Sequence, residues 1–554
     1  MSRSWNRYSI NRRELLKFAG AASAAAAVPI IRPTIGSAAP RAAQTGEKSA
    51  VIYFGGKPYS NWTGIRFWTN TGIPARMQWE PLLDLDDNLM PAPGLVEKWE
   101  VISNTVTRYH LQSGLTWSDG TPITTDDVVF SMNLTFHKDV ADLMATEIAT
   151  IKGAAEMQAG TADSVSGVRA LDEQSFEIET AQPDVSVLRT LALRWWGPLP
   201  KHVYESIAPA DLVTSEAFMQ PTVVSGPFKI DHIEPDKWYD MSANTSYFRG
   251  KAKLDKVTYV IGPIGDPVAL ASQGKFDYYL ARQPDIAAAL AKDPNYTVKT
   301  VEYIQPYRIQ LNASLPQFSD PRVRKAVAYA IDRETLSGQI YAGNATPQYT
   351  DFQGDLLDPS AEVYKYDPDM AKKLLSEANW DANEVLYFEQ PAIPTGQAID
   401  PIAQAQQAAY QQWLGDVGIK MELRAHPDSA SYANFTLPPS GPAKFGAYEN
   451  PHRRYDQYGP LELKTYLLST PHNYAYWSNK DADALVQQMI AETDPGKYTA
   501  LGRQLSILVA QECPYIPTQA VKWGIVSSKR FTGFTPIGEA YFAHMRPYDW
   551  DVTG

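Results

Sequence analysis

The chain has 554 residues, enough for two or three domains that each bury their own hydrophobic core. Its 62 acidic residues outnumber its 50 basic residues, and no cluster of lysines and arginines interrupts that balance, so we expect no nucleic-acid partner. The single cysteine, Cys513, excludes an internal disulfide and a metal site built from several thiolates.

The N-terminal segment 1–38 is predicted to be a twin-arginine-type signal peptide. The run 11–17 (NRRELLK) resembles the twin-arginine consensus. The apolar stretch from Phe18 to Ile31 is too short to span about 30 Å of hydrocarbon, but it suits an export signal. Small residues up to Ala38 suit cleavage at that point. We therefore expect an exported, soluble protein in the periplasm.

Short β-rich runs alternate with helical runs along the rest of the chain. Strands are predicted at 51–54, 107–111, 175–179 and 256–261. Helices are predicted to begin where a capping residue precedes an apolar face, at Thr124 with Asp127 and at the Asp–Pro pairs of Asp320, Asp367 and Asp494. Interleaved strands and helices indicate α/β domains, although the pattern does not give their connectivity.

Motifs for catalysis or metal binding are not found in the sequence. No two of the eight histidines lie three or four residues apart, and no GxSxG, HExxH or phosphate-binding loop is present. The acidic pair Asp126–Asp127 is interpreted as part of a helix start, and Cys513 as an inert buried thiol. The sequence predicts no metal, no cofactor and no enzymatic activity.

Seven blocks of sequence, in order along the chain, resemble a known family. They are Trp79–Asp84 (WEPLLD), Pro91–Glu100, Ser118–Phe130 (SDGTPITTDDVVF), Ser225–Ile230 (SGPFKI), Phe318–Arg333, Tyr366–Leu375 and Pro514–Pro517 (PYIP). Together they resemble the signature of family 5 solute-binding proteins, the peptide, nickel and oligosaccharide receptors of ABC importers. Most signature residues are interpreted as scaffold, because they are typical of turns and helix starts.

The resemblance implies an α/β protein of the two-lobe periplasmic-binding-protein fold, in which a hinge of two chain crossings joins the lobes. Lobe I is expected at 39–303 and 518–554 with an inserted subdomain at about 76–190, lobe II at 304–517, and the crossings near 303–308 and 517–520. A ligand can close such a hinge only if it contacts both lobes, so we expect two sets of contact residues.

Candidate ligand contacts follow from this fold. In lobe I they are Phe54, Gly55, Tyr59, Trp62, Trp68 and Trp195, with packing of the rings in the core of the lobe as the alternative. In lobe II they are Phe445, Gly446, Tyr448 and Glu449. Peptide receptors of the family bind the ligand's α-ammonium with an aspartate near this second segment.

The expected place of that aspartate holds no aspartate in this chain. Glu449 is the nearest carboxylate, and Asp456 lies further along beside Arg453 and Arg454. Glu449 could bind an ammonium group through a charge-assisted hydrogen bond, or it could be a solvated loop carboxylate. A standard peptide site is therefore not established by the sequence.

The resulting hypothesis is the substrate-binding subunit of an ABC importer, a monomer that captures a peptide or peptide-like solute by hinge closure and delivers it to a membrane permease. An oligosaccharide receptor is the alternative, because 31 tyrosines and 14 tryptophans could supply stacking platforms for sugars. Nickel is disfavoured because the histidines are dispersed. An exported hydrolase with a carboxylate pair is a third possibility, and it would turn its ligand over.

Overall fold

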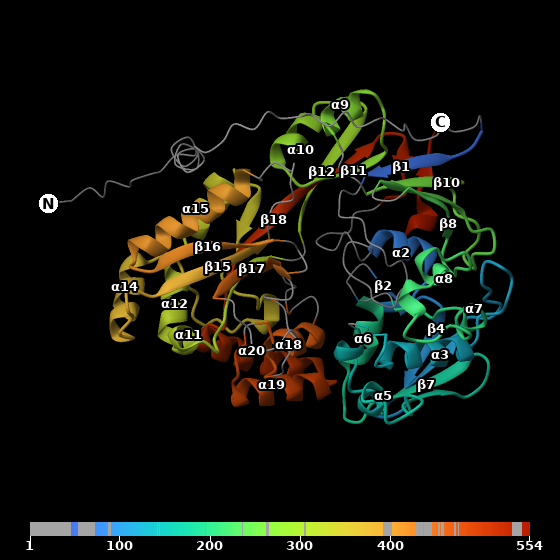
Figure 1. The fold of residues 1–554 in the computed structure, drawn as a ribbon, viewed down its shortest axis with the longest axis horizontal. Coiled ribbons are helices and arrows are strands. Elements are labelled where there is room, and N and C mark those ends of the chain that lie inside the picture. The colour runs from blue at the N-terminus through green and yellow to red at the C-terminus, as the bar shows by residue number, and fades with distance from the viewer. Residues whose placement is uncertain are drawn as a thin grey trace. The chain divides into compact units, whose positions relative to one another are not determined.

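The chain forms two compact units, which are described separately (Figure 1). The computed structural model describes residues 46–53, 72–86, 90–140, 142, 144–193, 196–234, 237–261, 265–303, 306–391, 401–427, 431–432, 436, 446–451, 455, 459–469, 473–474, 476–534 and 546–553. Of these, unit 1 contains Glu302–Met489 and Asp494–Lys522, and unit 2 contains the remainder. The predicted signal peptide lies outside the described residues, and the lobe boundaries given above remain predictions.

The sheet of unit 2 is built around three parallel strands. Its order is β18-β11-β1-β10-β9-β8, and β1 (Ser49–Tyr53) pairs in parallel with both β10 (Lys256–Val260) and β11 (Tyr278–Ala281). The other strands are antiparallel to their neighbours: β8 (Phe228–Glu234), β9 (Trp238–Ala243) and the second half of β18 (Tyr515–Ser528). The carboxyl ends of β1, β10 and β11 therefore lie at one edge of this sheet.

Helices and strands outside this sheet complete unit 2. Residues of α9 (Pro267–Ser272), α10 (Pro284–Leu290) and β12 (Tyr296–Glu302) form a core with one face of β1 and β11. A separate sheet of order β4-β5-β7-β6 comprises Val96–Val101, Val106–Leu111, Ser175–Glu179 and Val168–Ala170. The remaining elements are α2 (Gly72–Gln78), β2 (Leu83–Leu85), β3 (Pro91–Pro93), α3 (Thr125–Phe136), α4 (Met144–Glu147), α5 (Ala154–Gln158), α6 (Ser186–Leu193), α7 (Lys201–Tyr204), α8 (Glu216–Met219), β19 (Phe531–Thr532) and β20 (Asp551–Val552).

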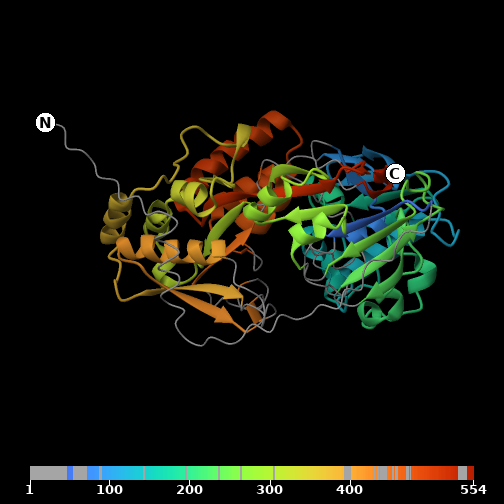
Figure 2. The ribbon, with the colours of Figure 1, turned by 90° about the horizontal axis from the view of Figure 1, so that it is seen from above.

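The sheet of unit 1 has the order β16-β15-β17-β13-β18. Strands β15 (Val385–Pro391), β16 (Lys420–His426) and β17 (Ala447–Pro451) are parallel, whereas β13 (Tyr307–Leu311) is antiparallel to β17 and to the first half of β18. In Figure 2 the orange helix α15 (Pro401–Asp416) lies along one face of β15 and β16. The other elements are α11 (Pro316–Ser319), α12 (Pro321–Ala330), α13 (Arg333–Thr335), β14 (Ala345–Pro347), α14 (Pro368–Glu377), α18 (Pro460–Leu467), α19 (Lys480–Ala491) and α20 (Pro495–Glu512).

The predicted helix starts are confirmed by the structure. Asp320, Asp367 and Asp494 each accept a hydrogen bond from a backbone N–H in the first turn, and each is followed by a proline at the first helical position. Thr124 and Asp127 form the predicted capping box at α3. Asp127 is buried and also accepts a hydrogen bond from the backbone N–H of Lys201, at 2.8 Å, so one carboxylate orders the start of α3 and of α7.

The WEPLLD block is a scaffold feature centred on a buried ion pair. Arg76 donates to Glu80 at 2.7 Å and to Asp84 at 2.6 Å, and its side chain is 2% exposed. Tyr247 donates to Glu80 at 2.8 Å, and Arg249 adds a longer contact at 3.3 Å. Burial alone would lower the pKa of Arg76, but the two carboxylates raise it above its ordinary value. The network ties the signature to residues that lie far away in the sequence.

The SGPF block depends on a close approach of two backbone segments. A Cβ atom on Gly226 would lie 2.5 Å from the carbonyl carbon of Gln78 and 2.6 Å from the carbonyl oxygen of Met77. The N–H of Gly226 donates to the carbonyl of Gln78 at 2.7 Å, which holds the segments together. No side chain fits without moving the backbone.

Replacement of Gly226 by alanine should therefore destabilise unit 2 by at least about 2 kcal/mol. The matched control is Gly415→Ala in α15, where an added Cβ meets nothing within 4 Å, and this change should be neutral or stabilise by roughly 0.5 kcal/mol. Urea denaturation followed by tryptophan fluorescence measures both variants. Equal stabilities of the two variants would contradict the close-approach argument.

Among the residues placed by the structure, no helix has both the length and the hydrophobicity that a membrane span requires.

Candidate functional site

Each unit has an edge where the carboxyl ends of parallel strands meet. In unit 1 this edge is formed by β15, β16 and β17, and in unit 2 by β10, β1 and β11. Ligands of open α/β sheets bind outside the carboxyl ends of the strands. Ligand-binding side chains are therefore expected at these two edges.

Most of the predicted ligand contacts lie outside the described residues. These are Phe54, Gly55, Tyr59, Trp62, Trp68, Trp195 and Phe445. Strand β1 ends at Tyr53, so Phe54 is the next residue in the sequence. Trp196, the neighbour of the predicted contact Trp195, is fully buried and donates through its indole nitrogen to the hydroxyl of Thr135 at 3.1 Å.

The other predicted contacts, Gly446, Tyr448 and Glu449, are at or within β17. Gly446 is buried, and a Cβ on it would lie 2.6 Å from the carbonyl oxygen of Tyr387. Tyr448 is 1% exposed, and its ring makes an edge-on contact with Tyr432 at a centroid distance of 6.5 Å. Because successive residues of a strand point to opposite faces, Tyr448 and Glu449 lie on opposite sides of the sheet.

Glu449 is the centre of a polar network between β17, β18 and α15. Its carboxylate accepts hydrogen bonds from the hydroxyl of Tyr410 at 2.9 Å, from the hydroxyl of Thr518 at 3.2 Å and from the amide of Gln406 at 2.5 Å. The side chains of these donors are buried, whereas Glu449 itself is partly exposed. The solvated-loop interpretation of Glu449 is therefore wrong, because the residue belongs to a strand and its carboxylate is held by three donors.

The donors around Glu449 are all neutral. Among the described side chains, no lysine, arginine or histidine forms an ion pair with the Glu449 carboxylate. Burial raises the pKa of Glu449 above its ordinary value, and the hydrogen bonds to the carboxylate oppose that shift. Nearby, the side chain of Gln519 is fully buried and its Oε1 atom has no donor in the described part of the chain. The Glu449 carboxylate thus has no cationic partner among the described side chains, which suits a ligand group that carries a positive charge.

The sequence did not indicate the residues that surround Glu449. Tyr410 and Gln406 come from α15 and Thr518 from β18, about 40 to 70 positions away in the chain. Only Thr518 follows a recognised block, PYIP, and that position could have pointed to it. The α15 residues carry no comparable signal.

A second carboxylate at the edge of unit 1 is already paired. Glu389 on β15 is fully buried and accepts hydrogen bonds from Arg424 at 2.9 Å and from His426 at 2.8 Å. Arg424 also stacks on the ring of Tyr387 at 4.8 Å. Because Glu389 has two basic partners on neighbouring β16, its charge is balanced within the unit, in contrast to that of Glu449.

The edge of unit 2 carries a basic side chain on an aromatic ring. Arg282 directly follows β11, and its guanidinium carbon lies 5.2 Å from the ring centroid of Trp523 on β18. The side chain of Arg282 is exposed, whereas Trp523 is 8% exposed. Neither residue was indicated by the sequence.

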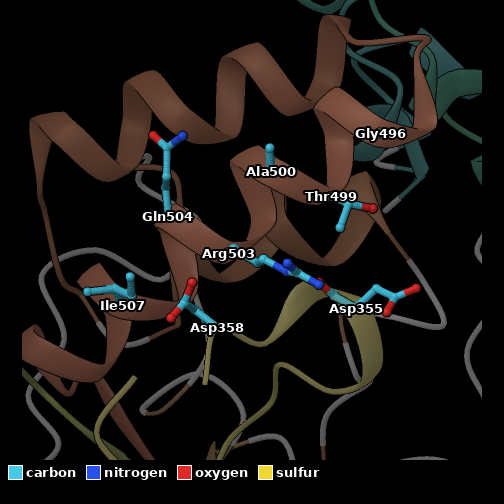
Figure 3. Close-up of a pocket in the computed structure, with 8 residues that line it drawn as sticks. All are labelled: Asp355, Asp358, Gly496, Thr499, Ala500, Arg503, Gln504 and Ile507. Atoms are coloured by element: carbon cyan, nitrogen blue, oxygen red, sulfur yellow. The ribbon is translucent and has the colours of Figure 1, made fainter. Parts of the chain in front are cut away.

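Unit 1 also has a groove of about 510 Å³ (Figure 3). This groove has fewer features for ligand recognition than the carboxyl edges of the sheets. One side of it is the face of α20 that carries Arg503, whose Nε donates to the carbonyl oxygen of Asp355 at 2.9 Å. Figure 3 shows the Arg503 side chain extending toward Asp355, with Asp358 nearby. The described residues of the lining include no aromatic side chain, and most of them belong to α20 and none to β15, β16 or β17.

Comparison with known families identifies the group to which the chain belongs. The family described as bacterial extracellular solute-binding proteins, family 5, matches residues 90–491, which is more than half of the chain. The chain belongs to this family. Its members are substrate-binding proteins and not enzymes, so the hydrolase hypothesis is rejected.

Curated relatives of this family 5 protein carry names that refer to ligand binding. A putative ABC transporter peptide-binding protein of Brucella melitensis is 27% identical over 487 residues, covering 85% of this chain and 88% of the relative. A probable deoxycholate-binding periplasmic protein of Escherichia coli is 26% identical over 462 residues, with 79% and 81% covered. These relatives support a binding role, and they differ in the ligand that their names give.

A solved structure shows the same fold. The oligopeptide-binding protein AppA of Bacillus subtilis, in complex with a nonapeptide, superposes with a TM-score of 0.75 at 19% identity, covering 92% of this chain and all of that chain. The protein therefore has the two-lobe fold of periplasmic binding proteins, as the sequence predicted. At this level of identity the likeness concerns the fold alone.

Proposed function

We propose that this protein is the substrate-binding subunit of an ABC importer, which captures a peptide or peptide-like solute by hinge closure in the periplasm and delivers it to a membrane permease. Membership of family 5 supports the importer, and the Brucella relative supports the peptide class. The twin-arginine-type segment of the sequence and the periplasmic relative support the location.

The observation that carries the peptide assignment is the environment of Glu449. Its carboxylate sits at the edge of unit 1 among neutral donors, and its charge is not balanced by any described basic side chain. The α-ammonium of a peptide would supply both the missing charge and N–H donors for the Glu449 carboxylate. A neutral sugar would leave that charge unbalanced.

Native mass spectrometry of the protein, purified without unfolding, tests this proposal. We expect a bound mass that fits a short peptide and that disappears after denaturation and refolding, with the peptide recovered intact. An oligosaccharide mass would support the alternative receptor, which the high aromatic content favours. A bile-acid-like mass, or failure of a peptide pool to bind the emptied protein, would overturn the peptide assignment.

A further inference from the structure

Tyr341 lies at an unusual point of the backbone of unit 1. It directly follows the π-helical turn Leu336–Ile340, and its N–H donates to the carbonyl of Leu336 at 3.0 Å in the wide π pattern. The next residue, Ala342, has a φ of 50°, in the left-handed region that favours glycine. Single π turns and left-handed residues other than glycine are uncommon, and both occur often at functional sites. This backbone fixes the point from which the Tyr341 side chain extends.

The side chain of Tyr341 begins a directed chain of hydrogen bonds. Its hydroxyl donates to the Oε1 atom of Gln406 on α15 at 2.6 Å, so the donor group of that amide, Nε2, points away from Tyr341. Nε2 donates to one oxygen of Glu449 at 2.5 Å and to the hydroxyl of Tyr410 at 3.1 Å. Tyr410 in turn donates to the other oxygen of Glu449 at 2.9 Å. The chain therefore ends on both oxygens of the candidate ligand-binding carboxylate.

The orientation of the Gln406 amide depends on Tyr341. Gln406 is 4% exposed, so water does not readily replace a lost partner. Its Oε1 atom has one further donor in the described part of the chain, the Nε2 atom of Gln519 at 3.4 Å, which is close to the upper limit for a hydrogen bond. Without the Tyr341 hydroxyl this buried acceptor would be poorly satisfied, and the amide would move to regain a partner. Such a movement weakens the hydrogen bond from Gln406 to Glu449.

Hydrogen bonds donated to Glu449 favour its ionised form. Burial raises the pKa of Glu449, and the bonds from Tyr410 and Gln406 oppose that effect. The titratable neighbours of the network are the tyrosines Tyr341, Tyr410 and Tyr432. Burial and the charge of Glu449 raise the pKa values of Tyr410 and Tyr432, so both hydroxyls keep their protons. Weaker donation by Gln406 would therefore not be offset by a neighbouring cation.

We propose that Tyr341 is a positioning residue of the Glu449 site, which acts through Gln406 to keep the carboxylate directed and charged for a ligand cation. The inference rests on the proposed function and deepens it, because it names a residue that tunes ammonium recognition from two hydrogen bonds away. All residues of the network belong to unit 1.

The pH profile of peptide affinity tests the proposal with Tyr341→Phe, which removes only the hydroxyl. Calorimetry from about pH 4 to pH 7 compares a tetrapeptide that has a free α-ammonium with its N-acetylated form. In Tyr341→Phe the midpoint of the rise in affinity for the free peptide should move up by about 0.5–1 pH unit, a loss of about three- to tenfold below the midpoint. The loss should shrink toward pH 7, and the acetylated peptide should bind as it does to wild type. An equal loss for both peptides at every pH, or an unchanged midpoint, would overturn the positioning role.

Gln406→Met tests whether Tyr341 acts through Gln406. This variant removes the amide donor to Glu449, so it should raise the midpoint on its own. Addition of Tyr341→Phe to Gln406→Met should then change the midpoint by less than about 0.2 pH unit, because both residues belong to one chain of hydrogen bonds. Additive shifts of the two substitutions would contradict the proposal.

Tyr329→Phe is the matched control. It also removes a hydroxyl that donates to a carboxylate in unit 1, because Tyr329 donates to the exposed Glu362 at 2.6 Å. The pH profile of this variant should equal that of wild type. A shift as large as that of Tyr341→Phe would show that the effect is not specific to the Glu449 network, and the proposal would fall.

Failure of the proposed function can be told apart from failure of the positioning role. If the wild-type protein binds neither peptide, the peptide assignment falls, and the positioning role is tested on the protein alone. Nuclear magnetic resonance of protein with ¹³C-labelled glutamate gives the pKa of Glu449, whose carboxyl signal is assigned by its absence in Glu449→Gln. A pKa higher by about 0.5–1 unit in Tyr341→Phe supports the role, and an equal pKa in both proteins overturns it.

Discussion

Arg76→Met should lower the free energy of unfolding of unit 2 by about 3–5 kcal/mol. The change removes the cation that contacts both Glu80 and Asp84, and these carboxylates are 0% and 8% exposed as whole residues. Glu80 would keep only Tyr247 and the longer contact with Arg249, so most of its charge would be buried without compensation. Urea denaturation followed by circular dichroism measures the loss.

Arg169→Met is the matched control for this prediction. Arg169 also binds a buried carboxylate, Glu177, at 2.8 Å, but its own side chain is 51% exposed. Its replacement should cost less than about 1 kcal/mol, because Glu177 keeps its ion pair with Arg108 at 2.7 Å and water screens the exposed Arg169 in the wild type. If Arg76→Met were no more destabilising than Arg169→Met, the buried network would not be what stabilises the WEPLLD block.

Glu449→Gln should weaken the binding of peptides with a free α-ammonium by 10- to 100-fold, whereas N-acetylated peptides should bind nearly as before. The variant keeps the size of the side chain and removes its charge. Calorimetry on matched free and acetylated peptides measures the difference, with Glu422→Gln, an exposed carboxylate on β16, as the control. Equal weakening for both kinds of peptide would contradict the ammonium assignment, and a neutral sugar ligand would be unaffected.

The pH dependence of stability and of peptide affinity provides an independent test of the role of Glu449. Burial raises the pKa of Glu449 in the folded protein, so this group contributes stability that is complete below its unfolded pKa of about 4.3 and is lost as the pH rises through its folded pKa. The advantage in stability of wild type over Glu449→Gln should therefore shrink as the pH rises through that window. Affinity for ammonium peptides should rise over the same window, because binding requires the ionised carboxylate.

How well the sequence predicted the fold depends on how far apart in the sequence the interacting residues lie. Helix starts such as Asp320 and Asp494 were predictable, because a cap and its first turn lie within three residues of each other. The distant partners of Glu80 were not predictable, because Tyr247 and Arg249 are brought to it by folding from more than 160 residues away. The block WEPLLD therefore identified the family without showing what its carboxylates do.

The candidate site was predicted only in outline. The position of Glu449 near a ligand-binding strand came from the resemblance, but its neutral environment depends on α15 and β18, which carry no local signal. Arg282 was missed for a similar reason, since its stacking partner Trp523 is 241 positions away in the chain. Pairing between distant strands decides such contacts, and composition or periodicity does not contain that information.

The position of strand β18 in the chain determines when the two sheets can be completed during folding. This one segment, Tyr515–Ser528, pairs with β13 in unit 1 through its first half and with β11 in unit 2 through its second half. Neither sheet can be completed before the ribosome has synthesised residue 528, however early β1 and β11 emerge. Final assembly of both sheets therefore waits for this late segment and must overcome the slow search for contacts between distant parts of the chain.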